Sequence, residues 1–141
     1  MPASFDRFGI SFQYPDNWTL ETEEDRGGVQ SVTVQSPTGA FWTVAIHLPG
    51  ASAEAVLATG LKVMRQLYDE LDSEPVTETV LGKTLHGQDL NFYCLDLTNT
   101  AWLRALATDE ATFLIMYQAE DRDLDEVEAV LRAITISFLK N

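Results

Sequence analysis

The order of two hydrophobic periodicities along the chain constrains its fold more than any other feature. Between residues 10 and 48, apolar residues alternate with polar ones in short segments separated by turn residues, which is typical of half-buried strands. Across residues 53–71, apolar residues recur at spacings of three and four, which predicts an amphipathic helix. Extended segments follow as far as residue 119, and a second helical stripe begins after Asp121. This order predicts an α+β fold built on an antiparallel sheet.

The boundaries of these elements follow from turn and capping residues. Strands are predicted at residues 10–14, near 18–20, and at 29–35, 41–48, 76–81, 90–97, 101–108 and 111–119, with turns that include 82–83, 86–87, 98–100 and 109–110. Ser52 is placed to cap the first helix, and Asp121 or Asp123 the second, with Glu126 completing a capping box after Asp123. Residues 134–138 fit either a continued helix or an extended tail.

Charge and size limit the classes of partner. The 141 residues carry 22 acids and 9 bases, a formal net charge of −13. This balance argues against nucleic acid and against anionic membrane surfaces, because both require clustered Lys and Arg. The start of the chain lacks a signal pattern, and no run of about 18 apolar residues occurs. We therefore expect one cytoplasmic domain over residues 1–141, a monomer or weak dimer, with a protein as the expected kind of partner.

Few residues have the spacing that catalysis or metal binding requires. His47 and His86 lie in different segments, and neither has a second His or Cys at ligand spacing. Cys94, the single cysteine, lies in an apolar run that predicts a buried thiol. The acidic run from Asp121 resembles a calcium loop but has Glu126 at the position of the required glycine. The sequence predicts no catalytic, cofactor-binding or metal-binding residue.

The candidate partner surface combines an acidic segment with two tryptophans. Residues 21–25 are predicted to form a solvated acidic loop, and large aromatic side chains commonly anchor partners. Trp18 follows a turn and Trp102 shares a strand face with Arg104, so each could be partly exposed, although we favour a core position for both. The candidate residues are Glu21, Glu23, Glu24, Asp25, Trp18 and Trp102.

The opening and the end of the chain resemble a known superfamily. Residues 9–18 match the form G-[IF]-x-F-x-Y-P-x-x-W, and residues 134–138 match the form I-x-x-S-F that follows a final helix. Both are similar to the PsbP/Mog/DcrB-like superfamily, and the order of elements agrees across nearly the full chain. The resemblance implies a central antiparallel sheet flanked by helices, in α/β/α layers. It also implies a binding or accessory role, because members include an extrinsic photosystem II subunit, a Ran-binding transport factor and bacterial envelope proteins.

Three functional hypotheses follow. The leading one is a non-enzymatic binding or accessory domain for a protein partner. The second is an acidic cytoplasmic secretion-type chaperone, which the size and charge fit, although such chaperones commonly open with a helix. The third is an unrecognised hydrolase or small-ligand binder that uses His47 or His86.

Overall fold

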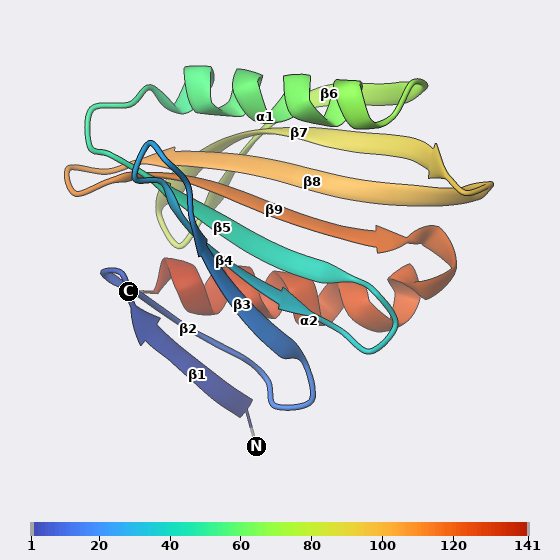
Figure 1. Cartoon of the computed structure of the whole chain (residues 1–141), viewed down its shortest axis with the longest axis horizontal. Helices are drawn as coiled ribbons and strands as arrows, with labels where there is room; N and C mark the ends of the chain where they lie inside the picture. The colour runs from blue at the N-terminus through green and yellow to red at the C-terminus, as the bar shows by residue number, and fades with distance from the viewer. Residues whose placement is uncertain (1, 141) are drawn as a thin grey trace.

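The computed structural model describes residues 2–140 and contains a seven-stranded antiparallel sheet, a helix on each face of it, and a separate two-stranded hairpin (Figure 1). The elements are β1 (Pro2–Arg7), β2 (Ile10–Pro15), β3 (Thr19–Glu24), β4 (Gln30–Gln35), β5 (Phe41–His47), α1 (Ala53–Leu67), β6 (Leu71–Val80), β7 (Lys83–Cys94), β8 (Leu97–Ala107), β9 (Thr112–Glu120) and α2 (Asp121–Leu139). The strand order in the sheet is β3-β4-β5-β9-β8-β7-β6. The predicted α+β class, with an antiparallel sheet flanked by helices, is confirmed.

One face of the sheet is covered jointly by α2 and the hairpin. The buried ring of Trp42 on β5 lies 4.8 Å from the ring of Phe12 on β2 and 5.9 Å from that of Phe138 on α2, measured between centroids. The Trp42 Nε1–H also donates a 2.9 Å hydrogen bond to Thr135 Oγ1 of α2, so its polar edge is satisfied inside the core. Trp42 therefore joins the sheet, the hairpin and α2 in one core.

The other face carries α1, which packs against β7, β8 and β9. Met64 of α1 is buried on Leu90 and Leu103 of the sheet, in a second and smaller core. Gly60 brings the helix close to the sheet, because a Cβ there would lie 2.9 Å from Leu114 Cδ2. The molecule thus has the α/β/α layering that the family resemblance implied.

The start of α1 agrees with its prediction and its end does not. Ser52 caps the helix by accepting a hydrogen bond from the Ala55 N–H at 3.2 Å. The helix ends at Leu67, earlier than predicted, and the ring of Tyr68 stacks on Phe92 of β7 at 4.1 Å. Leu71, which fits the helical stripe, instead begins β6. A single apolar residue at the end of a stripe fits either period, and tertiary packing decides between them.

The second helix begins with acids that bind other elements rather than the helix itself. Asp121 accepts a 2.6 Å hydrogen bond from Thr100 Oγ1 of β8, and Asp123 accepts one at 2.5 Å from Thr38 Oγ1 of the β4–β5 turn. The N-cap position falls on residue 120, which makes no side-chain capping bond, so the predicted caps and capping box are wrong. Residues 134–138 are helical. Within residues 2–140, neither helix is long and apolar enough to span a membrane.

The N-terminal strand was not predicted from the sequence. Residues 10–14 form β2 as expected, and this strand pairs with β1, whereas β3, β4 and β5 pair with one another in sequence order. Phe5 of β1 stacks on Phe12 at 5.4 Å and is buried. Residues 2–7 contain too few apolar side chains to show an alternation, so only the pairing reveals the strand.

Three predicted turns or loops are strands in the structure. His86 and Gly87 lie inside β7, residues 98–100 lie inside β8, and residues 21–24 of the predicted acidic loop form β3. The β7–β8 turn falls instead at Leu95 and Asp96, which have φ values of 52° and 63°. Turn-forming residue types are only a local preference, and the long pairing of β7 with β8 outweighs it here.

Candidate functional site

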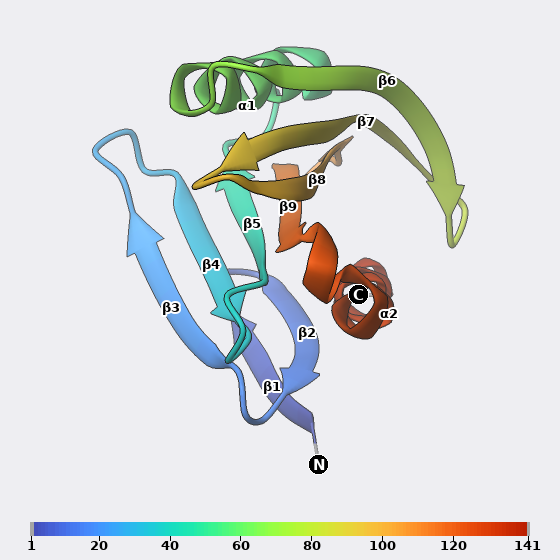
Figure 2. The ribbon, with the colours of Figure 1, turned by 90° about the vertical axis from the view of Figure 1, so that its right-hand side faces the viewer.

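Half of one sheet face has no helix over it. Because α1 packs on β7, β8 and β9, the same face of β3, β4 and β5 lacks a covering helix within residues 2–140. Figure 2 shows α1 above one end of the sheet and β3 at the opposite edge. We call this surface the open face; it consists of Glu21 and Glu23 of β3, Ser31, Thr33 and Gln35 of β4, and Phe41, Thr43, Ala45 and His47 of β5.

Small polar side chains form the floor of the open face. The strand register places Glu21 beside Thr33, Thr33 beside Thr43, and Thr43 beside Met116 of β9. Thr33 Oγ1 donates a 2.8 Å hydrogen bond to Thr43 Oγ1, so the two hydroxyl groups hold each other in place across the strands. The floor is therefore mostly uncharged, and its two central hydroxyl groups are hydrogen-bonded to each other.

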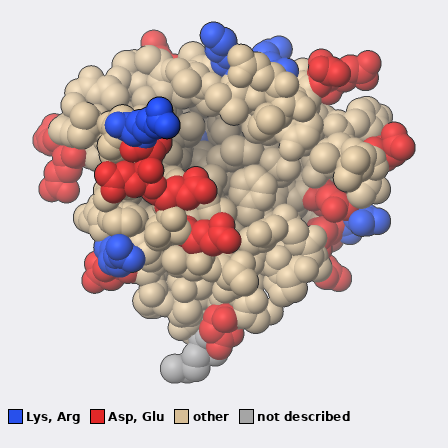
Figure 3. Space-filling view, in the orientation of Figure 1, with Lys and Arg blue, Asp and Glu red and all other residues tan. Residues whose placement is uncertain are grey.

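Acidic side chains stand at the rim of this face. Figure 3 shows acids gathered around the region of β3 and the β3–β4 loop, beside a hollow whose visible surface is mostly uncharged. Glu21 and Glu23 are both exposed and belong to this rim. An uncharged floor with a negative rim favours a ligand that is large and at least partly cationic.

The structure divides the predicted acidic cluster into three positions. Glu21 and Glu23 lie on the open face, whereas Glu24 alternates to the opposite face of β3. Asp25 lies in the β3–β4 loop, where its Oδ1 accepts hydrogen bonds from the N–H groups of Gly27 at 2.8 Å and Val29 at 2.9 Å. Asp25 thus shapes the loop, and only two of the four predicted acids lie together on the open face.

The two candidate tryptophans are core residues. Trp18 is 8% exposed and belongs to the core beneath α2 and the hairpin. Trp102 is 9% exposed, and its ring lies 4.7 Å from the ring of Tyr117. The favoured core position is confirmed for both, which removes them from the partner surface.

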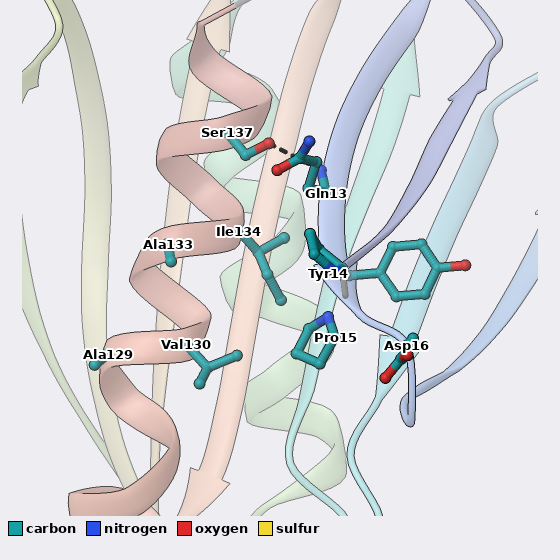
Figure 4. Close-up of a pocket in the computed structure, with 10 residues that line it drawn as sticks. Gln13, Tyr14, Pro15, Asp16, Ala129, Val130, Ala133, Ile134 and Ser137 are labelled. Atoms are coloured by element: carbon teal, nitrogen blue, oxygen red, sulfur yellow. Dashed lines mark hydrogen bonds between the residues drawn. The ribbon is translucent and has the colours of Figure 1, made fainter.

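A second concave feature is a groove between β2 and α2 (Figure 4). It has a volume of about 540 Å³. Its walls are mainly apolar, and they include Pro15 from the end of β2 and Val130, Ala133 and Ile134 along one side of α2. The Gln13 N–H donates a 2.8 Å hydrogen bond to Ser137 Oγ at one end, which ties the strand to the helix. The groove can take an apolar side chain.

A buried ionic group lies on the α2 side of β6, β7 and β8. Arg104 of β8 forms ion pairs with Asp89 at 2.8 Å and with Glu78 at 3.1 Å, and it also donates to the Leu103 carbonyl at 2.9 Å. Its side chain is 3% exposed, whereas those of Glu78 and Asp89 are 26% and 39% exposed. A buried arginine held by two carboxylates at such distances joins three strands, so we interpret it as structural.

Two pKa values in this region are shifted. Burial alone would lower the pKa of Arg104, but hydrogen bonding and attraction to Asp89 outweigh it and raise that pKa above its ordinary value. Burial raises the pKa of Tyr117, and the positive charge of Arg104 opposes part of that rise. The raised pKa of Arg104 keeps its guanidinium group charged, as a structural ion pair requires.

The structure does not bring the two histidines together. His47 is half-buried at the end of β5, and His86 is exposed on β7. Their strands are three positions apart in the sheet, which separates the strands by about 14 Å. Cys94 lies eight residues beyond His86 on the same strand and packs toward the α1 core. Among residues 2–140, no three His, Cys, Asp or Glu side chains are grouped as a metal site requires.

The sequence did not predict the uncovered part of the sheet or the buried ion pairs of Arg104. The alternation of residues 41–47 does contain a signal, because Trp42 and Val44 occupy one face while Thr43 and Ala45 occupy the other. That pattern indicates unequal covering of the two faces. A lone arginine inside the apolar run 101–107 indicates a buried charge, but its partners come from β6 and β7, which the sequence alone does not place beside it.

Comparisons with known proteins show a similarity of fold and no match at the level of sequence. No protein family model and no curated protein sequence matches the chain. Among solved structures, cyanobacterial PsbP from Synechocystis sp. PCC 6803 is 15% identical with a TM-score of 0.59, over 96% of this chain and 90% of that one. A Pseudomonas aeruginosa protein of unknown function, described as a putative regulator, is 10% identical with a TM-score of 0.56, over 96% and 94% of the two chains. A Bacteroides thetaiotaomicron protein is 16% identical with a TM-score of 0.57, over 88% of this chain and 43% of that one.

Proposed function

We propose that this PsbP-like domain is a non-enzymatic binding or accessory domain whose partner is another protein. The observation that carries the proposal is the open face, half of a sheet surface with no helix over it in residues 2–140. A chain of this size can bury both faces of its sheet, and α1 does so over β7, β8 and β9. A strand surface of small polar side chains bounded by charged ones suits a broad macromolecular contact better than a small substrate, which usually binds in a deep and mainly apolar pocket.

The charge supports a protein rather than a nucleic acid or a lipid surface. The net charge is −13, and the open face has acids at its rim. Phosphate-bearing partners would be repelled, whereas a basic segment of a protein would be attracted. We therefore place the partner contact on the open face, with the cytoplasm as its proposed compartment.

Site-specific photocrosslinking tests this proposal. A photoreactive phenylalanine replaces Gln35, which is exposed on the open face, and in a control protein it replaces Glu126, which is exposed on α2. We expect one discrete adduct from Gln35 in cells of the source organism and none from Glu126. The crosslinked protein is then purified, and its affinity for the unmodified domain is measured by calorimetry.

The result that contradicts the proposal is equally specific. Equal adducts from both positions, or a crosslinked protein without measurable affinity for the purified domain, would show that the open face is not a partner surface. Turnover of a defined substrate that survives replacement of Gln35 by arginine would indicate an enzyme with its site elsewhere.

A further inference from the structure

The two edges of the sheet are not equivalent. β3 forms one edge and β6 the other. An edge strand presents unpaired backbone N–H and C=O groups that can take up another strand, and proteins commonly block this with proline or charge. Which backbone groups point outward follows from the alternation of hydrogen-bonded and non-hydrogen-bonded pairs in an antiparallel ladder.

A proline interrupts the outer side of β6. The two-residue turn at Leu81 and Gly82, both with positive φ, closes the β6–β7 hairpin on the hydrogen-bonded pair Val80 and Lys83. Hydrogen-bonded pairs then recur at every second residue back from Val80. Pro75 falls between two of them, so its backbone nitrogen points away from β7. Proline has no N–H, so an added strand would lack a donor in the middle of this edge.

The outer side of β3 is uninterrupted. The Asp25 N–H donates to the Val29 carbonyl at 2.9 Å, which makes this the first hydrogen-bonded pair of the β3–β4 hairpin. Alternation from there turns the N–H and C=O groups of Leu20, Thr22 and Glu24 away from β4. All three donors are present, and β4 is the one strand paired with β3 in residues 2–140.

The side chains of β3 determine which strand fits. Glu21 and Glu23 project on the open face, whereas Leu20 packs against the core on the other side. A second copy of β3 would place glutamates beside glutamates, and like charges on neighbouring strands are destabilising. A strand with Lys or Arg at alternate positions would place cations beside both glutamates and apolar residues beside Leu20.

We propose that β3 accepts an extended, basic segment of a protein partner as an eighth strand of the sheet, with its cations alternating on the side of the open face. This inference rests on the proposed function and names the chemistry of the partner. Backbone hydrogen bonds to Leu20, Thr22 and Glu24 hold the segment, and Glu21 and Glu23 select it by charge.

The test uses the full chain and a defined probe, the peptide Thr-Lys-Val-Lys-Val-Lys-Thr with blocked ends. We expect saturable binding at low salt by isothermal calorimetry, with slower amide hydrogen exchange at Leu20, Thr22 and Glu24 by nuclear magnetic resonance. The peptide N-methylated at alternate residues keeps its charge but loses backbone donors, so we expect its affinity to fall at least about tenfold.

Matched variants separate the edge from charge alone. Glu21→Lys with Glu23→Lys should weaken binding about tenfold, and Asp72→Lys with Glu74→Lys on β6, the same change in net charge, should not. Equal losses in both variants, unchanged affinity of the N-methylated peptide, or a dimer that buries β3 at low salt would overturn the inference. If the peptide does not bind but the Gln35 crosslink succeeds, this inference fails and the proposed function stands. If the peptide binds but the Gln35 crosslink fails, the proposed protein contact on the open face is wrong.

Discussion

Gly87 provides a sharp test of how β7 and β8 pack. A Cβ at this position would lie 2.3 Å from the Leu103 carbonyl oxygen and 2.7 Å from Arg104 Cδ and Nη1. The carbonyl belongs to the backbone of β8 and cannot rotate away, and Arg104 is held by its two ion pairs. Gly87→Ala must therefore separate the strands locally or displace the guanidinium group.

The cost of that displacement can be estimated from the contacts that are lost. Breaking a buried ion pair by disturbing one partner costs about 3–5 kcal/mol. For Gly87→Ala we take the lower part of that range, about 3 kcal/mol, because Asp89 and Glu78 are partly exposed and water replaces some of the lost interaction. In a domain of this length, such a loss lowers the melting temperature by roughly 6–12 °C.

Urea unfolding followed by tryptophan fluorescence measures this loss, because the three tryptophans are buried. Gly60→Ala is the matched control: its new Cβ would meet only flexible leucine side chains, and alanine favours the helix, so we expect a change within about 1 kcal/mol of zero. In an Arg104→Ala background, Gly87→Ala should cost less than in the natural protein. A loss below about 1 kcal/mol for Gly87→Ala would refute the close approach described here.

Three further predictions concern the core. Because burial raises the pKa of Tyr117 in the folded state, Tyr117 ionises first in the unfolded chain, and the free energy of unfolding should fall as pH rises above about 10. Tyr117→Phe should reduce that fall, whereas Tyr93→Phe, at an exposed site, should not. Urea unfolding across the alkaline pH range measures both. Trp42→Phe should lower the free energy of unfolding by about 2 kcal/mol, through a lost hydrogen bond and a small cavity. Thr135→Val should be less destabilising in the Trp42→Phe protein than in the natural protein, because the indole that donates to Thr135 is already absent. Lys83→Met removes the ammonium group that donates to the Leu139 carbonyl, so amide exchange should accelerate in the last turn of α2 while α1 remains unchanged as the control.

Local patterns predicted the class of the fold and most of its elements. The alternation of Trp42 and Val44 identified a strand, and Ser52 identified the start of a helix, because each signal lies within a few residues of the structure it determines. The motif at residues 9–18 implied the PsbP-like fold, which the solved structures confirm.

Features that depend on distant pairing were not predictable in the same way. Gly87 was interpreted as a turn residue, yet it is paired with both β6 and β8 inside a strand. The position requires glycine because β8 approaches too closely for a side chain. Residues 21–24 were interpreted as a loop, because acids are rare in buried strands and nothing in the sequence shows that β3 lies at an edge, where acids are tolerated. The uncovered part of the sheet depends on where α1 lands, and that is decided by its contacts with β7, β8 and β9.

The acidity of β3 affects two kinds of association, and salt changes them in opposite directions. In the binding mode that we propose, the glutamates of β3 disfavour pairing with a second copy of this edge, and the same charges attract a basic strand. Screening shortens the range of both effects, to about 3 Å at 1 M salt. High salt therefore weakens the attraction of a basic segment while removing the repulsion between copies, although the backbone groups of Leu20, Thr22 and Glu24 stay outward in both cases. We therefore expect a block made of charge, unlike the proline of β6, to be selective: it would disfavour a second copy of the domain and leave the edge available to a partner of opposite sign.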